Sequence, residues 1–450
     1  MPVVRHQAEC EEPHLESRAR LRQHINKRLV ISRFVKNDIA SIAAVHDVMN
    51  GAPLPVPDLS SHDHPRPDHV NTRAASISSA DVSTKQRVAI VGGGVIGCAI
   101  AFELTRRGVE VSVWERRTIG GGATHASAGI LAPYIEAHEG GPLFDLTVRG
   151  LATYDVFVRA VREVTSAPFE FRRNGTIEVA EDDVRARVLK SRSRGPVTRW
   201  LDAAELRTLE PSVNATAVGG VLCEEHGYVG VTGFVTALAE AASRQGCVFH
   251  NRGSVAAIRL DGRMCVLEFG PDRDEVTVDR VVLSTGTWAR ELDPLNELQE
   301  RVRPIRGQLL QVRWPEQHIE HVLWGASCYI VPWLDGSILI GATSEDVGFD
   351  ETATLGGIAD LMTAASTLLP GIGVATFEAV RVGLRPATAD HLPIIGASPL
   401  DPRVIYATGH FRNGVLLAPL TAQLVASLIV DGTSDPLLAA TSITRYKNGA

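Results

Sequence analysis

The sequence predicts an α/β protein built on a doubly wound parallel sheet. The β-branched run Val88 to Val91 is typical of a short strand buried on both faces. Three glycines follow it, then an apolar stretch from Cys98 to Arg107 that is predicted to be a helix ended by Gly108. The next run, Val109 to Glu115, is again typical of a strand, and strand-like and helical stretches keep alternating along the chain.

The later elements are expected in an order that suits this class. A helix is expected over Gly233 to Arg244, a strand over Cys247 to Asn251, and two short strands over Val276 to Ser284. An apolar helix is expected over Leu420 to Val430. Four further segments are expected to form a separate antiparallel sheet: Phe169 to Ala180, Ile305 to Val312, Tyr329 to Trp333 and Ser337 to Ala342.

Length and composition limit the class of protein. The chain has 450 residues, of which 44% are hydrophobic, enough for two or three domains at roughly 150 residues each. Collagen-like and wholly disordered chains are thereby excluded. Lys and Arg number 45 against 52 Asp and Glu, so the net charge is −7. This balance disfavours nucleic acid as a partner, because binding to phosphates needs a basic surplus.

The six cysteines form no CxxC pair, which disfavours both a zinc site and a disulfide framework and favours a reducing, cytoplasmic location. The uncharged run from Val88 to Phe102 is about 15 residues and is broken by three consecutive glycines, so it is too short to span a membrane. Residues 1–86 are expected to be a largely disordered extension with a Pro-rich linker and no targeting signal. His62, His64 and His69 lie in it without cysteine partners, and no metal site is predicted.

The glycines Gly92, Gly94 and Gly97 form a GxGxxG pattern between the first strand and the first helix. The first allows a tight turn, the second lets a pyrophosphate approach the backbone, and the third lets helix and strand pack closely. Glu115 ends the second strand, where a carboxylate accepts the hydroxyls of an adenosine ribose. The pattern predicts a dinucleotide site, but it does not by itself decide between a nicotinamide and a flavin dinucleotide.

Two further glycine-rich segments favour the flavin. The loop Gly120 to Pro133 consists mostly of small residues, which suits backbone contacts to a cofactor, although a flexible surface loop has the same composition. Gly409 to Pro419 again places glycines before an apolar helix. A second glycine-rich turn at a helix N-terminus suits a long cofactor that both parts of the chain hold.

These segments, together with Gly383-Leu-Arg-Pro386, resemble the D-amino-acid-oxidase-type flavoproteins from about Arg87 to Gly432. The motif Gly409 to Pro419 is most similar to that of the glycine oxidases of thiamine biosynthesis. The resemblance implies a Rossmann-like FAD-binding domain interleaved with an antiparallel-sheet substrate domain, as in the D-amino-acid oxidase and glutathione reductase type of flavoprotein fold. The FAD-binding domain is expected over 87–143, 218–291 and 379–435, and the substrate domain over 144–217 and 292–378.

The resemblance also implies site residues. Substrate binding falls to Arg385, Arg412 and Tyr329, and a guanidinium pairs well with an amino-acid carboxylate. No catalytic side chain is implied, because the flavin N5 atom accepts the hydride. Residues implied to bind FAD are Gly92, Gly94, Val95, Ile96, Gly97, Glu115, Arg116, Ala123, Thr124, Ala128, Gly129, Ile130, Val255, His410, Phe411, Arg412, Asn413, Gly414, Val415 and Leu416. In the related sarcosine oxidases the flavin is attached to a cysteine in the C-terminal half of the chain. Here the last cysteine, Cys328, comes well before the motif around Arg385, so the FAD is expected to be non-covalent.

The implied activity is the oxidative deamination of glycine, or of a small amine such as sarcosine or a D-amino acid. With molecular oxygen as the electron acceptor, the products are a 2-oxo acid, ammonia and hydrogen peroxide. A role in thiamine thiazole synthesis and a homo-oligomer are implied as well. A dehydrogenase with another electron acceptor, a flavin protein without turnover and a nicotinamide dehydrogenase remain open. Ser327 and Ser344 stand where glycine oxidases tend to carry bulkier side chains, and His125 stands where they carry a small one. We therefore expect a wider or more polar pocket.

Overall fold

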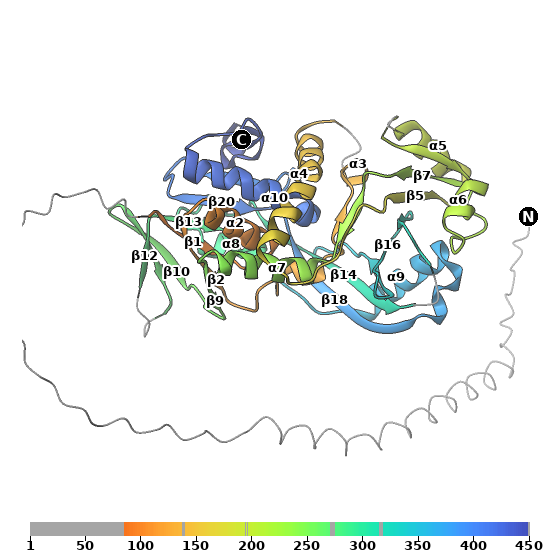
Figure 1. Ribbon diagram of the computed structural model, residues 1–450, viewed down its shortest axis with the longest axis horizontal. Helices are drawn as coiled ribbons and strands as arrows, with labels where there is room; N and C mark the ends of the chain where they lie inside the picture. The colour runs from red at the N-terminus through yellow and green to blue at the C-terminus, as the bar shows by residue number, and fades with distance from the viewer. Residues whose placement is uncertain are drawn as a thin grey trace, which may run out of the picture. The chain divides into compact units, whose positions relative to one another are not determined.

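The structure is a computed structural model that describes residues 85–136, 140–193, 195, 197–270, 275–314 and 318–448. The predictions made for the N-terminal extension up to residue 84, including its three closely spaced histidines, lie outside the described residues. Residues from Asp81 onward form one unit, which is described below (Figure 1).

A six-stranded sheet forms the centre of this unit. Its order is β19 (Ile394–Ala397), β20 (Val404–Thr408), β13 (Arg280–Leu283), β1 (Arg87–Val91), β2 (Glu110–Glu115) and β9 (Val248–Asn251). All neighbours are parallel except β19 and β20. The carboxyl ends of β1, β2, β13 and β20 therefore meet at one edge of the sheet, which is where open α/β sheets bind their ligands.

Apolar helices cover one face of this sheet (Figure 1). They are α2 (Val95–Arg106), α7 (Val231–Arg244), α10 (Gly414–Ala426) and α4 (Pro142–Val164). Every residue of α2 from Val95 to Thr105 is buried, and α10 packs against both α2 and α4. Within the described residues one helix, Phe411–Asp431, is long and apolar enough to cross a membrane. However, 72% of its apolar 18-residue stretch is buried inside the fold. Its apolar character is thus explained by its place in this core.

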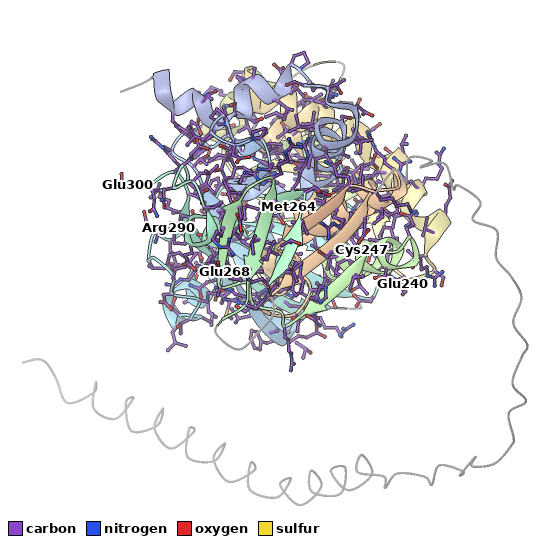
Figure 2. The ribbon with its side chains drawn as sticks, turned by 90° about the vertical axis from the view of Figure 1, so that its left-hand side faces the viewer. Glu240, Cys247, Met264, Glu268, Arg290 and Glu300 are labelled. Carbon is purple, nitrogen blue, oxygen red and sulfur yellow. The ribbon has the colours of Figure 1, made fainter. Side chains whose placement is uncertain are left out.

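A small antiparallel sheet covers the opposite face. It consists of β10 (Ala257–Asp261), β11 (Met264–Glu268) and β12 (Val276–Val278), and Figure 2 labels Met264 and Glu268 on its middle strand. Leu267 of this sheet and Ala89 of β1 belong to one buried cluster. The expected Rossmann-like parallel sheet is confirmed, with helices on one face and this small β-sheet, instead of further helices, on the other.

The second sheet has eight strands. Its order is β18 (Thr376–Ala387), β14 (Arg303–Arg313), β17 (Ser337–Gly341), β16 (Tyr329–Pro332), β15 (Val322–Trp324), β5 (Thr176–Ala180), β7 (Gly219–Cys223) and β6 (Arg199–Asp202). It is antiparallel except for β15 and β5, which are parallel. The expected antiparallel sheet is confirmed apart from that pair, where β15 joins the sheet after a long crossover. Helix α9 (Leu355–Leu368) packs on this sheet and contributes to a separate core.

The remaining elements are short. A three-stranded sheet joins β3 (Ile130–Leu131), β8 (Gly227–Val229) and β4 (Phe171–Arg172). The short helices are η2 (Ala123–Ala126), α3 (Pro133–Glu136), α5 (Asp183–Arg192), α6 (Ala203–Leu209), η3 (Gly286–Trp288), α8 (Ala289–Leu292), η4 (Pro370–Val374), η5 (Phe411–Asn413), η6 (Ser427–Asp431), α11 (Leu437–Thr441) and η7 (Ile443–Asn448).

The expected domain boundaries can be compared with this arrangement. The boundary between residues 143 and 144 falls inside α4, whose Tyr154 and Phe157 belong to the same core as α2 and α10. Helix α4 therefore packs with α7 and α10, helices of the layer that covers the six-stranded sheet, although most of it was assigned to the substrate domain by sequence. The exact division of the chain into domains stays a prediction.

Candidate active site

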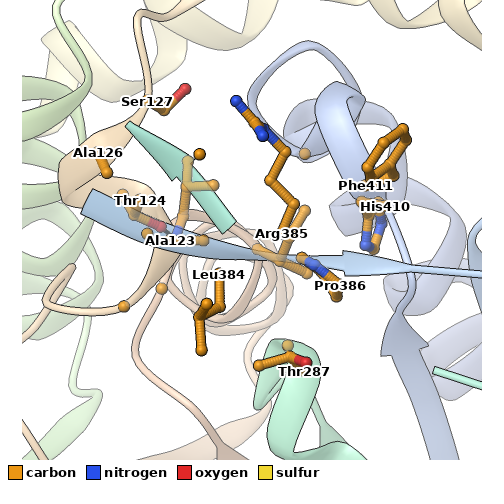
Figure 3. A pocket seen from close by; sticks show the side chains of 18 of the residues that line it. Ala123, Thr124, Ala126, Ser127, Thr287, Leu384, Arg385, Pro386, His410 and Phe411 are labelled. Atoms are coloured by element: carbon orange, nitrogen blue, oxygen red, sulfur yellow. Dashed lines mark hydrogen bonds between the residues drawn. The ribbon is translucent and has the colours of Figure 1, made fainter. Parts of the chain in front are cut away.

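A cavity of about 550 Å³ is lined by residues of both large sheets. One end lies at the carboxyl ends of β1, β2 and β13, next to Gly92 and Glu115, and the other lies against β16, β17 and β18, next to Tyr329 and Arg385. A volume of this size is typical of a ligand or cofactor site. Figure 3 shows part of this cavity.

The glycine turn between β1 and α2 is as tight as the sequence predicts. Gly92 has φ +107°, and a Cβ atom there would lie 2.5 Å from the carbonyl oxygen of Ser284. A Cβ atom at Gly97 would overlap the carbonyl oxygen of Gly92, so the third glycine permits close packing of helix and strand. Helix α2 begins after Gly94 with no acidic residue in its first turn. Its N-terminus therefore offers partial positive charge to an anion in the cavity.

Glu115 both holds this turn and lines the cavity. One carboxylate oxygen, Oε2, accepts a hydrogen bond from the Gly93 amide at 2.8 Å, and Oε1 accepts one from the Arg117 amide at 2.7 Å. Each carboxylate oxygen has a second lone pair, so the side chain can still accept hydroxyl groups of a ribose. Beyond it, the guanidinium groups of Arg116 and Arg117 lie over the Trp288 ring, 4.5 and 4.7 Å from its centroid.

The small-residue loop after β2 forms the middle of the cavity wall. Gly129 has φ +75°, and its carbonyl oxygen accepts a hydrogen bond from Val229 of β8 at 3.0 Å. The Thr124 hydroxyl accepts the first amide of α2, from Val95, at 3.0 Å. A Cβ atom on Gly383 of β18 would lie 2.8 Å from the Cβ atom of Ala126, so glycine at position 383 lets the loop approach the second sheet.

Arg385 lies at the other end, and Figure 3 shows its side chain and that of Leu384 on opposite faces of β18. Its Nη1 atom donates to the carbonyl oxygen of Thr343 at 2.9 Å and to that of Arg306 at 3.4 Å. The guanidinium lies against Gly307 and the Tyr329 ring lies against Gly341, because a Cβ atom at either glycine would collide with these groups. Two glycines thus make room for the two predicted substrate-binding side chains.

Two buried titratable side chains of the cavity wall stay uncharged near neutral pH. Complete burial lowers the pKa of His410 to about 3, and its Nε2 atom lies 3.0 Å from the Thr421 hydroxyl. Burial raises the pKa of the Cys328 thiol to about 12. Among the described residues that line the cavity, the carboxylates are Glu115 and Glu291, and Glu291 lies 3.9 Å from Arg116 at the dinucleotide end.

The structure brings most of the predicted site residues together. The cavity is lined by Gly92, Gly94, Val95, Ile96, Glu115, Arg116, Ala123, Thr124, Ala128, Gly129, Ile130, Val255, Tyr329, Arg385, His410, Phe411, Arg412, Asn413, Gly414 and Val415. Gly97 and Leu416 do not line it: Gly97 lies beneath the turn, and Leu416 is buried in the helix core. Arg412 is exposed, and Ser327 and Ser344 line the cavity as expected. His125 is exposed and turned toward the Gly122 carbonyl, so its expected effect on the pocket is wrong.

Sequence reasoning missed the segment Ser284 to Trp288, which lines the cavity beyond the end of β13. Within the part of the chain that the structure describes, the buried hydroxyl oxygens of Thr285 and Thr287 have no hydrogen-bond partner. Such groups fit a long cofactor that carries hydroxyls, carbonyls and phosphates, because buried polar atoms are otherwise almost always paired. Two short turn residues, Thr285 and Gly286, after a buried parallel strand were the available signal.

Known proteins resemble this chain in both sequence and structure. Residues 87–428 match the sequence model of the DAO family, described as FAD dependent oxidoreductase. The glycine oxidase of Geobacillus kaustophilus is 35% identical over 366 residues, which span 80% of this chain and 97% of that protein. Its crystal structure superposes with a TM-score of 0.76 at 34% identity and covers 80% of this chain and 99% of that one. The Bifunctional protein ThiO/ThiG of a Nostoc species is 36% identical over 78% of this chain, and the matched region is 54% of that longer protein.

Proposed function

Because the chain belongs to the DAO family of FAD-dependent oxidoreductases, we propose that it oxidises glycine or a similarly small amine. FAD is its cofactor and molecular oxygen the final electron acceptor, and an amino acid, oxygen and water give a 2-oxo acid, ammonia and hydrogen peroxide. One observation carries this proposal: the glycine cradle and Arg385 line the same cavity, so a dinucleotide and a carboxylate can be held side by side. The similarity to a glycine oxidase along 97% of that protein supports the same reaction.

Each end of the cavity has its own task. The amides at the start of α2 and the carboxylate of Glu115 would hold the pyrophosphate and the adenosine ribose. Arg385 would bind the substrate carboxylate, with the Tyr329 hydroxyl orienting it from β16 and Arg412 at the rim. When bound, FAD supplies the two-electron acceptor for the oxidation of the carbon–nitrogen bond. The protein contributes binding and orientation of the substrate.

The substrate amine has to lose its ammonium proton before oxidation. Neither His410 nor Cys328 can accept that proton near neutral pH, given the direction of their pKa shifts. We therefore expect the amine to bind in its neutral form, and the rate at low substrate should rise with pH as the free amine deprotonates.

The test uses the purified chain in air. Its visible spectrum is recorded while glycine, sarcosine and a panel of D-amino acids are added, and hydrogen peroxide is measured for each turnover. Bleaching of the flavin bands by glycine with one peroxide per amine supports the oxidase, whereas bleaching without peroxide would assign a dehydrogenase. Flavin bands that no small amine bleaches would overturn the proposed substrate class. Acid precipitation, which releases only non-covalent flavin, tests the mode of attachment.

A pair of arginines on one strand tests the substrate anchor. Arg381 and Arg385 lie on the same face of β18, but Arg381 does not line the cavity and instead pairs with Gln311. Arg385→Ala should raise the KM for glycine by roughly 10-fold to 150-fold, the effect of losing about 1.5–3 kcal/mol of charge-assisted hydrogen bonding. Arg381→Ala should leave KM near the wild-type value, and equal effects of the two variants would remove Arg385 from the site.

Three finer assignments belong to the same proposal. The exposed Ser327 and Ser344 leave space beside Tyr329, so sarcosine and small D-amino acids should be oxidised as well as glycine. The similarity to a ThiO/ThiG protein supports a role in thiamine synthesis. The five described cysteines are free thiols, which supports a cytoplasmic location. The homo-oligomer stays a prediction, to be tested by size-exclusion chromatography with light scattering.

A further inference from the structure

A polar network lies behind Arg385, and most of its members, Arg306, Gln308, Glu345 and Asp350, do not line the cavity. Its centre is Arg306 of β14, a cation whose side chain is only 4% exposed. The Arg306 guanidinium pairs with Glu345 at 2.5 Å and with Asp350 at 2.6 Å. Both carboxylates lie in the segment 342–354 between β17 and α9, which folds back over β14. A buried arginine needs such partners, because an unpaired buried charge is strongly destabilising.

The Glu345 carboxylate accepts hydrogen bonds from three side chains. Its Oε2 atom accepts from Arg306, while its Oε1 atom accepts from the Thr343 hydroxyl at 2.6 Å and from the Gln308 side-chain amide at 2.8 Å. Burial would raise the pKa of Glu345, but the hydrogen bonds from Arg306, Thr343 and Gln308 lower it to about 2. The carboxylate is therefore charged at every pH at which the enzyme would work.

The same contacts fix the two carbonyl groups that Arg385 uses. The Thr343 amide donates to the Gln308 carbonyl at 3.1 Å, and the Gln308 amide donates to the Thr343 hydroxyl at 2.9 Å. The backbones of Glu345 and Arg306 exchange two hydrogen bonds, at 2.9 and 3.0 Å. Thr343 and Arg306 are thus held on both sides, and their carbonyl oxygens accept from the Nη1 atom of Arg385.

We propose that Glu345 is a positioning residue for substrate binding. Its carboxylate ties Thr343, Gln308 and Arg306 together, and this holds the two backbone carbonyl groups that fix the Arg385 guanidinium in the cavity. Glu345 itself is not among the residues that line the cavity. The inference rests on the proposed role of Arg385 as the anchor of the substrate carboxylate.

The test compares two neighbouring carboxylates in the holoenzyme. Glu345→Gln keeps the shape but loses the charge and part of the acceptor capacity. Asp346→Asn makes the same change one residue later, where the carboxylate pairs with Arg303 on the surface and both side chains are exposed. Three quantities are measured: the KM and kcat for glycine, and the dissociation constant of acetate from the shift that it causes in the flavin spectrum. Acetate reports carboxylate binding without any turnover.

For Glu345→Gln we expect the glycine KM and the acetate dissociation constant to rise about tenfold, while kcat stays within about twofold. Asp346→Asn should leave all three near wild type. Equal values for the two variants, or a fall in kcat with KM unchanged, would overturn the proposal. If Glu345→Gln does not fold, Glu345→Asp carries the same test, because it keeps the charge but shortens the side chain that reaches Arg306, Thr343 and Gln308.

Arg385→Ala separates this proposal from the proposed function. If Arg385→Ala weakens acetate binding and Glu345→Gln does not, Arg385 remains the anchor and only the positioning role fails. If acetate binding is unchanged in Arg385→Ala, the anchor itself is elsewhere and the proposed function has to be revised.

Discussion

Replacing Gly307 by alanine should displace Arg385 without unfolding the protein. Gly307 lies in β14, directly opposite Gly383 of β18, and it is not among the glycines with positive φ. The backbone can therefore accept alanine without strain. A Cβ atom at Gly307 would lie 2.3 Å from the Cζ atom of Arg385. The collision is with the far end of a flexible side chain, which can swing aside.

The size of the effect follows from that distance. Two carbon atoms in contact need about 3.5 Å, so the guanidinium has to move by about 1 Å. A misplacement of that size in a binding group can cost about 100-fold, equivalent to about 2.7 kcal/mol. The substrate carboxylate is bound in the ground state and in the transition state alike, so the loss should appear in KM rather than in kcat.

The assay is peroxide formation from glycine, with the flavin content and the melting temperature measured on the same preparations. Gly356→Ala is the control, because nothing lies within 4 Å of a Cβ atom at that position. Gly307→Ala is expected to keep its flavin and its melting temperature while the KM rises by about 100-fold. A KM within about threefold of wild type would refute the reasoning, and so would an equally large rise when Gly307→Ala is added to Arg385→Ala.

Three further predictions test the cofactor end and the pH range. Gly97→Ala should abolish flavin binding and lower the melting temperature, because its Cβ atom would overlap the Gly92 carbonyl oxygen, a backbone atom that cannot swing aside; retained flavin absorbance would contradict this. Thr287→Val removes a buried hydroxyl that is unpaired within the described residues, so FAD should dissociate about 2-fold to 10-fold more readily, and an unchanged FAD dissociation constant would remove this hydroxyl from the site. Burial and then the charge of Arg173 lower the pKa of His226 to about 3, against about 6.5 when unfolded. Below about pH 6.5 His226 therefore binds a proton in the unfolded chain but not in the native protein. Because of this difference, the free energy of unfolding should fall by about 2 kcal/mol between pH 7 and pH 5. Urea unfolding of His226→Gln should show a smaller fall, and equal falls would contradict the assignment.

The sequence determined the part of the site that depends on local backbone requirements. The turn from Gly92 to Gly97 and the carboxylate of Glu115 were predicted because each needs a particular residue type at a fixed spacing along the chain. The same holds for the strands and the helix around them, whose apolar runs are continuous. Gly92 and Glu115 both line the cavity, as their spacing along the chain predicts.

The tertiary structure decided what depends on the register between distant strands. Gly307 and Gly341 leave room for Arg385 and Tyr329, but a glycine inside a strand gives no sign of what lies across from it. Leu416 belongs to the core and His125 to the surface, because which face of a helix is buried depends on how that helix packs in the fold. The network around Glu345 joins residues 306, 343 and 385, far apart in sequence. Cross-strand pairing alone brings them together, and no pattern within one segment of the chain encodes it.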